Sequence, residues 1–300
     1  VPVHLGSMSE SIKTIIRENN KTMMPGDAFL INAPYNGGTH LPDITLIKPV
    51  YDEKNEQVIF YVATRGHHSD IGGTVPGSAP AYSTHVKEEG ILIDNFLLVS
   101  KGVFLEEEIY DLLTSGEYPV RNVKDNIADL KAQVAAAEKG AQELLKVIDH
   151  YGLDVVHAYM RHVQDNAEEC VRRVLDVLSD SSFTYKMDDE YQVCVAISVD
   201  KAERTATIDF TGTSEQHPSN FNAPKAICHA AVLYVFRCLV DDEIPLNEGC
   251  FKPLNIIIPE GSMINPVYPA AVVAGNTETS QYIVDALFGA LGVVAASQGT

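Results

Sequence analysis

Two glycine-rich loops in the first part of the chain each carry a histidine and an aspartate three residues apart. The first pair is His40 and Asp43, and the second is His67 and Asp70. Imidazole and carboxylate are the usual ligands of a divalent transition metal that thiolates do not hold. A single pair of this kind arises often by chance, and a histidine often only caps a turn. Because the pair recurs in two similar loops, we predict that His40, Asp43, His67 and Asp70 converge on one divalent cation, Mn²⁺ or Zn²⁺.

The second loop also contains His68, whose direction depends on the backbone. In an extended segment His68 and Asp70 point to the same side, whereas in a turn His67 and Asp70 do. If His67 binds metal, we expect His68 to face away or to support the ligands from behind. The candidate catalytic residues are His67, His68 and Asp70, together with Arg65 at the start of the loop.

Strands are expected to place both loops at one edge of a sheet. Ala28–Asn32 precedes the first loop, and Ile44–Val50 and Val58–Thr64 form a strand pair across the polar turn Asp52–Glu56. Each loop follows or flanks a strand, so both can lie at the same edge. Glycines let the backbone of both loops bend tightly and expose the side chains.

The middle of the chain has the pattern of helices. Over Arg121–Leu178 apolar residues recur every three or four positions, with a break at His150–Gly152. This pattern predicts a pair of long antiparallel helices that forms a structural wall. The last third combines a hairpin over Gln192–Phe210 with helices at Ala223–Val240 and Ser280–Ala296.

We therefore expect an α+β fold in three parts. A β-rich front with the glycine-rich loops covers residues 1–118, the helical pair covers 119–180 and an α/β rear covers 181–300. The chain opens without an initiator methionine and stops just after a helical stretch. It is expected to be a fragment of a larger chain, truncated at both ends.

Four further polar residues are candidates for substrate binding. Thr213, Asn222 and Asn276 lie in loops whose hydroxyls and amides can hold a substrate carboxylate or imide, although turn formation and helix capping are their default roles. Asp129 lies one helical turn from Gln133 and can reach a site, although surface helices carry such residues routinely.

The segment Asp70–Thr74 resembles the phosphate loop of actin-like ATPases, in which an apolar strand leads into an aspartate and two glycines. Here the polar run Arg65–Ser69 precedes the aspartate, and Pro76 cannot donate a backbone hydrogen bond. No GxxxxGK[ST] motif occurs. We therefore do not expect this segment to bind ATP.

Composition excludes several classes of partner. The net charge of −19 would repel a phosphate backbone, so no nucleic acid is expected. No apolar run approaches the roughly 20 residues of a membrane helix, so no membrane partner is expected. The five cysteines form no CxxC motif, which favours a reduced, cytoplasmic protein over a disulfide framework or a thiolate zinc site. The sequence contains no Gly-x-Ser-x-Gly elbow, so it does not suggest a serine hydrolase.

Motifs over nearly the whole chain resemble the hydantoinase B/5-oxoprolinase family, in the family's order. The matching stretches are GGTHLPD (37–43), RGHHSDIGG (65–73), PGSAP (76–80), EEG (88–90), DLKAQVAA (129–136), DFTGT (209–213), NAP (222–224), PLNEGC (245–250) and GNTETSQ (275–281). Residues 1–8 and 151–160 resemble the C-terminal, hydantoinase B-type half of ATP-dependent 5-oxoprolinases in particular. The chain departs from the family at Ala33, where an acidic or polar residue is frequent, and stops at Thr300, before an asparagine-rich continuation.

The resemblance implies a division of labour. A hydantoinase A-type ATPase half, in the same chain or in a separate subunit, would use ATP to phosphorylate the oxygen of a small cyclic amide. The B-type half, residues 1–300, would open the activated ring of 5-oxo-L-proline with water and release L-glutamate. The metal ion would lower the pKa of that water, and Arg65 would face the phosphate or the substrate carboxylate. A homo-oligomer is also expected.

Two alternatives stay open at this point. A hydantoinase or an acetone- or acetophenone-type carboxylase subunit would use the same site on another carbonyl substrate. A non-catalytic scaffold would only dock the ATPase half, but scaffolding needs no clustered ligand-type residues.

Overall fold

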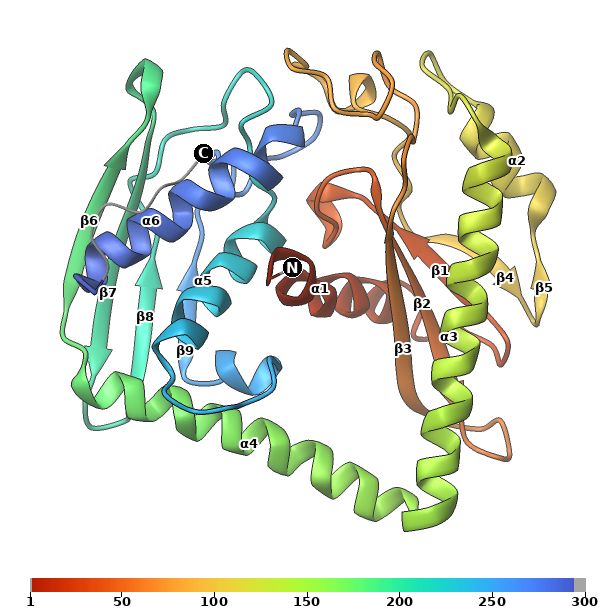
Figure 1. Ribbon diagram of the computed structural model, residues 1–300, viewed down its shortest axis with the longest axis horizontal. Coiled ribbons are helices and arrows are strands. Elements are labelled where there is room, and N and C mark those ends of the chain that lie inside the picture. Colours follow the sequence, from red (N-terminus) through yellow and green to blue (C-terminus); the bar gives the residue numbers. More distant parts are fainter. Residues whose placement is uncertain (1, 294–300) are drawn as a thin grey trace. The chain divides into compact units, whose positions relative to one another are not determined.

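The computed structural model describes residues 2–293 and has the expected α+β fold (Figure 1). Its contacts divide the chain into two compact units, residues 8–152 and residues 1–7 together with 153–300. Within residues 2–293 there are six α-helices and two sheets. None of the helices in that range is both long enough and apolar enough to cross a bilayer.

The first sheet, in the unit of residues 8–152, contains five antiparallel strands in the order β3-β2-β1-β4-β5. The strands are β1 (Ala28–Ile31), β2 (Asp43–Tyr51), β3 (Val58–His67), β4 (Phe96–Ser100) and β5 (Val103–Phe104). The β2–β3 register runs from Asp43 opposite His67 to Tyr51 opposite Val58. The hairpin expected from the sequence is confirmed, and β3 continues to His67, into the second glycine-rich loop.

Successive side chains of a strand point to opposite faces of the sheet, and those of β2 are buried on both faces. Helices cover both of these faces. The helices are α1 (Pro2–Asn19), α2 (Glu106–Thr114) and α3 (Val123–Tyr151). Ile47 packs in a cluster with Ile15 of α1. Its neighbour Leu46 packs in a second cluster with Leu130 of α3 and Ile109 of α2. Strand β2 is thereby packed from both faces of the sheet.

The second sheet has the order β6-β7-β8-β9 and is antiparallel except for the pair β8–β9. Its unit contains β6 (Ser181–Lys186), β7 (Gln192–Asp200), β8 (Thr205–Asp209), β9 (Leu254–Ile257), α4 (Leu153–Val177), α5 (Lys225–Leu239) and α6 (Ser280–Leu291). Parallel strands need a long crossover, and α5 lies in the connection from β8 to β9. Phe236 of α5 and Phe210 are fully buried in the core of this unit.

The two long helices expected from the sequence are confirmed as α3 and α4, separated at Gly152, whose φ is +84°. The apolar stripes of the two helices are buried in different cores. Leu130 of α3 is buried in the core of the first sheet, whereas Ala167 and Val171 of α4 are buried in the core of the second. An amphipathic stripe indicates that a face is buried, but it does not identify the covering element.

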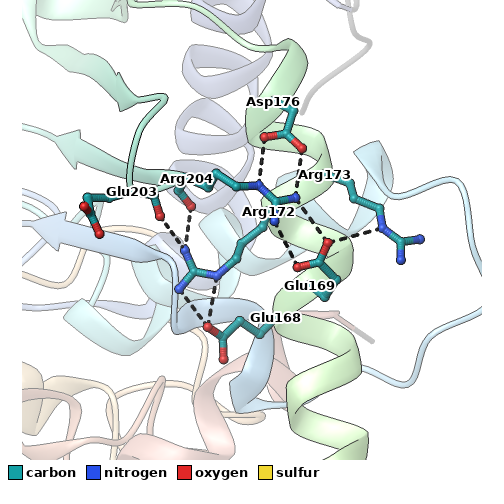
Figure 2. A network of polar contacts seen from close by, with 7 residues as sticks. All are labelled: Glu168, Glu169, Arg172, Arg173, Asp176, Glu203 and Arg204. Carbon is teal, nitrogen blue, oxygen red and sulfur yellow. Dashed lines mark hydrogen bonds and ion pairs between the residues drawn. The ribbon is translucent and has the colours of Figure 1, made fainter.

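Charged side chains tie the β7–β8 turn to α4 (Figure 2). Arg172 donates to two backbone carbonyls of the turn at 2.9 and 2.8 Å and to the Glu168 carboxylate at 2.7 Å. From the turn, Arg204 donates in the opposite direction to Glu169 and Asp176. Two guanidinium groups, one from each element, therefore fasten the turn to the helix.

Candidate functional site: a histidine–aspartate cluster

The β2–β3 hairpin places the two predicted loops together. Asp43 begins β2 and pairs with His67 at the end of β3, while Thr45 pairs with Arg65. Residues opposite each other in antiparallel strands project to the same face of the sheet. Asp43, Thr45, Arg65 and His67 therefore share one face, and His40 reaches the same place from the loop before β2.

Asp43 joins the two histidines of this cluster. Its Oδ1 accepts from His67 Nδ1 at 2.9 Å, and its Oδ2 lies 2.8 Å from His40 Nδ1. Thr39 Oγ1 donates to Oδ2 at 2.9 Å. The Asp43 side chain is 0% exposed and the His67 side chain is 55% exposed, so a buried carboxylate holds an imidazole that solvent can reach. The hydrogen bond to Asp43 raises the pKa of His67, although burial acts against it.

The cluster fits a divalent metal by its chemistry. His40, Asp43 and His67 each offer a ligand atom, and these atoms lie within 4.8 Å of one another. Two imidazoles and one carboxylate suit Mn²⁺, Fe²⁺ or Zn²⁺ better than a soft ion. Three of the four predicted ligands are therefore brought together.

Asp70 is the exception, because its carboxylate is engaged within its own loop. The backbone amides of Gly72 and Gly77 each donate to it at 3.0 Å, and Arg121 Nη1 donates at 2.8 Å. Burial acts to raise the pKa of Asp70, but these hydrogen bonds outweigh it and hold the pKa below its usual value. The structure therefore does not group Asp70 with the other three predicted ligands: β3 ends at His67, and the Asp70 carboxylate binds backbone amides of the loop that follows.

His68 points to the other face of the sheet, as expected of a histidine that faces away. It is 1% exposed, and its ring lies between two amides of α3. Its Nε2 is 3.1 Å from Gln133 Oε1, and its Nδ1 is 3.0 Å from Asn126 Nδ2. The separate prediction of a catalytic role has no support from this placement, because the ring is buried away from the cluster.

The hydrogen-bond partners define the protonation of His68. Gln133 Nε2 donates to the carbonyls of Ile44 and Thr64 at 3.0 and 3.3 Å, so Gln133 Oε1 must accept from His68 Nε2. Asn126 Nδ2 also donates to the Asp70 carbonyl at 2.8 Å, so it faces a His68 Nδ1 that accepts. The ring is therefore neutral with its proton on Nε2. Burial lowers the pKa of His68 in the same sense.

Arg65 lies behind the cluster. Its Nε donates to Thr45 Oγ1 at 2.7 Å and its Nη2 to Ser11 Oγ of α1 at 3.0 Å. Ser11 Oγ in turn donates to the Gly37 carbonyl in the first loop at 2.6 Å. Burial lowers the pKa of Arg65 to about 10, and the nearby Asp43 carboxylate opposes this shift. Arg65 is still a cation at neutral pH and links α1 and the first loop to the strand that carries His67.

Several residues of the site were not predicted. The sequence does not single out Thr39, Ser11 or Asn126, and it indicates only that Gln133, one helical turn from Asp129, can also reach a site. Asn126 and Gln133 lie seven positions apart in the stripe of α3 that also buries Leu130, and a buried amide at a core position is a signal that a sequence does contain. Asp129 is exposed on α3, near enough for its charge to act on His68.

The other three substrate-binding candidates belong to the second unit. Asn222 is fully buried and donates to the carbonyls of His217, Ser219 and Ala271. Thr213 Oγ1 accepts from the backbone amide of Cys194 and donates to its carbonyl. The Asn276 carbonyl accepts from Ser280 Oγ. Substrate binding by these three residues stays a prediction.

Comparison with known proteins gives matches over the full chain. The family model described as hydantoinase B/oxoprolinase matches residues 1–300. The chain is 44% identical over 311 residues to 5-oxoprolinase of Saccharomyces cerevisiae and 42% identical over 323 residues to 5-oxoprolinase 1 of Arabidopsis thaliana. All of this chain is matched in both cases, but it spans only 24% and 25% of those relatives.

Two solved structures have the same fold. The ATP-dependent caprolactamase from Pseudomonas jessenii has a TM-score of 0.84 and 25% sequence identity, covering 97% of this chain and 51% of that one. A nucleotide-free acetone carboxylase has a TM-score of 0.81 at 17% identity, covering 96% of this chain and 40% of that one, which shows the fold alone. The family model and the relatives agree over the whole chain, and the chain belongs to the hydantoinase B/oxoprolinase family.

Proposed function

We propose that this region opens the ring of a phosphate-activated cyclic amide, converting activated 5-oxo-L-proline to L-glutamate. The two relatives described above match all of the chain and are named 5-oxoprolinases, and the caprolactamase also takes its name from a cyclic amide. The observation that carries the proposal is the cluster of His40, Asp43 and His67, in which a buried carboxylate presents an accessible imidazole.

Ring opening requires a water oxygen to add to the phosphate-bearing carbon, the C–N bond to break and the ring nitrogen to gain a proton, which leaves an acyl phosphate. A second water must then displace phosphate from that acyl group to leave the side-chain carboxylate of glutamate. Asp43 contacts both rings: its Oδ1 is hydrogen-bonded to His67 Nδ1, and its Oδ2 lies 2.8 Å from His40 Nδ1. Arg65 adds a fixed positive charge beside Asp43. A divalent ion held by His40, Asp43 and His67 would acidify water and stabilise negative charge on the substrate.

We further propose that ATP is bound by a hydantoinase A-type ATPase region and not by residues 1–300. The chain spans about a quarter of its 5-oxoprolinase relatives, which leaves room for such a region in a longer polypeptide. In the segment that resembles a phosphate loop, the Asp70 carboxylate accepts hydrogen bonds from Gly72, Gly77 and Arg121. These contacts support a structural role for Asp70 instead of a role in binding phosphate.

The test uses the full-length protein with its ATPase region and compares His67→Ala with His150→Ala, an exposed histidine outside the cluster. Metal content by mass spectrometry should be near stoichiometric in the wild type and in His150→Ala, and lost in His67→Ala. Glutamate formation from 5-oxoproline should fall by about 100-fold or more in His67→Ala. Full activity and full metal content in His67→Ala would refute the proposal.

A further inference from the structure

We infer that His68 is a positioning residue. It is hydrogen-bonded to Asn126 and Gln133 of α3, and it thereby fixes the end of β3 so that His67 points toward Asp43. The geometry comes from contacts within residues 8–152, and the consequence for metal binding rests on the proposed function. His68 would then act through His67 and would not touch the substrate.

The backbone of His68 already joins the two loops. Its amide donates to the Pro42 carbonyl at 2.9 Å, in the residue that precedes Asp43. Its side chain is fixed on the α3 side by the two amides, and neighbouring residues of an extended chain project to opposite sides. A rotation that moved His67 away from Asp43 would therefore break the contacts of His68 on both its backbone and its ring.

Gln133 extends this restraint to both strands. Its Nε2 donates to Ile44 of β2 and Thr64 of β3, so one amide holds the two strands in register beside the cluster. Gly66 makes the approach possible, because a Cβ at that position would lie 3.2 Å from Gln133 Cδ. A larger residue at position 66 would have to push the amide away from the strands.

The polar character of this network points to orientation as its purpose. Leucine would fill the space of His68, but apolar packing is not directional, whereas buried hydrogen bonds specify one arrangement. A buried polar group is costly unless it is satisfied, and both nitrogens of the His68 ring have a partner. Burial of the His68 ring therefore costs little free energy of folding while both hydrogen-bond partners are present, and much more when one partner is removed.

The experiment compares His68→Leu with His68→Gln in the full-length protein. Glutamine keeps an N–H that can donate to Gln133, whereas leucine keeps only bulk. His68→Leu should weaken Mn²⁺ binding by about 10–100-fold, and a crystal structure should show His67 Nδ1 beyond hydrogen-bond distance of Asp43. His68→Gln should recover most of both properties. In His68→Leu, kcat should fall while KM and the shape of the pH profile stay close to wild type.

Leu130→Ala is the stability control. Leu130 lies between Asn126 and Gln133 on α3, and its truncation opens a cavity in the core of the first sheet without removing a partner of His68. Equal loss of Mn²⁺ affinity in Leu130→Ala and His68→Leu would overturn the inference, and so would an intact His67–Asp43 contact in His68→Leu. A His68→Gln protein as inactive as His68→Leu, with normal Mn²⁺ affinity and an altered pH profile, would make His68 catalytic instead. A wild type that binds no Mn²⁺ would contradict the proposed metal site, and the His67–Asp43 distance would still decide the role of His68.

Discussion

At the scale of single residues, the cluster depends on Asp43, because one carboxylate serves both imidazoles. Each of its oxygens accepts from a different ring, and Oδ2 also accepts from Thr39. Removing the Asp43 charge should therefore disturb both histidines at once.

Asp43→Asn should abolish metal binding and lower ring opening by about 100-fold or more, because the amide NH₂ would face one of the two rings. Thr39→Val removes one hydrogen bond from the same oxygen and should cost only about 1 kcal/mol of stability. Metal titration and glutamate formation, measured on both variants, check this difference. Equal losses would mean that the site depends on packing around Asp43 and not on its charge.

Asp70 gives a prediction about pH. Its pKa in the folded protein lies below the usual 3.8, so the carboxylate contributes stability above that value and loses it as pH falls through the folded pKa. Asp70→Asn should therefore lower the thermal midpoint at pH 7, and the difference from the wild type should shrink towards pH 3. The effect should be modest because the group is partly solvated. A difference that stays constant between these pH values would contradict the role given to its charge.

At the scale of elements, the sequence predicted the hairpin that builds the site but not the helix packing. A polar turn between two alternating strands sets the register, and that register puts Asp43 opposite His67. Asp70 lies past the end of β3, in a loop whose path depends on Gly72 and Gly73 at positive φ, so spacing alone could not place it. The sequence also contains the apolar stripe of α3, but it does not show which element packs on that stripe, because this depends on tertiary contacts.

The contacts between α4 and the β7–β8 turn can be tested with two neighbouring arginines of α4, because Arg172 contacts the turn, whereas Arg173 contacts Glu169. Arg172→Met removes the donors to two turn carbonyls and should raise hydrogen exchange in residues 200–204, at a cost of about 1–2 kcal/mol. Arg173 only approaches Glu169 at 3.5 Å, so Arg173→Met should leave that exchange unchanged. Hydrogen exchange with mass spectrometry checks both variants. A turn equally protected in both would show that the contacts of Arg172 do not restrain it.

At the scale of the molecule, each unit has its own core, and the histidine–aspartate cluster belongs to residues 8–152. The three polar loop residues predicted to bind substrate belong to the other unit. The sequence indicated their residue types, but it could not separate turn-forming amides from ligand-binding ones, because both lie in glycine-rich loops. Burial and hydrogen-bond partners become known only from the structure, as the three carbonyl contacts of Asn222 illustrate.

Phe236→Ala should show whether the two cores respond separately. The fully buried ring lies in the core of the second unit, and its truncation should cost about 3–5 kcal/mol there. Loss of hydrogen-exchange protection should appear in residues 153–293, while β2 and β3 keep theirs. Equal loss in β2 and β3 would indicate that the cores unfold as one.

The β2–β3 turn is a suitable place to attach a reporter. Asn55 at its tip is exposed with φ +57°, and exposed tips tolerate insertions. The nine residues of β2, rising about 3.3 Å each, put the tip roughly 25–30 Å from Asp43. A dye on a cysteine-bearing tag inserted beside Asn55 would leave Asp43 and His67 untouched. Energy transfer from that dye could then follow the arrival of an ATPase region labelled with a second dye.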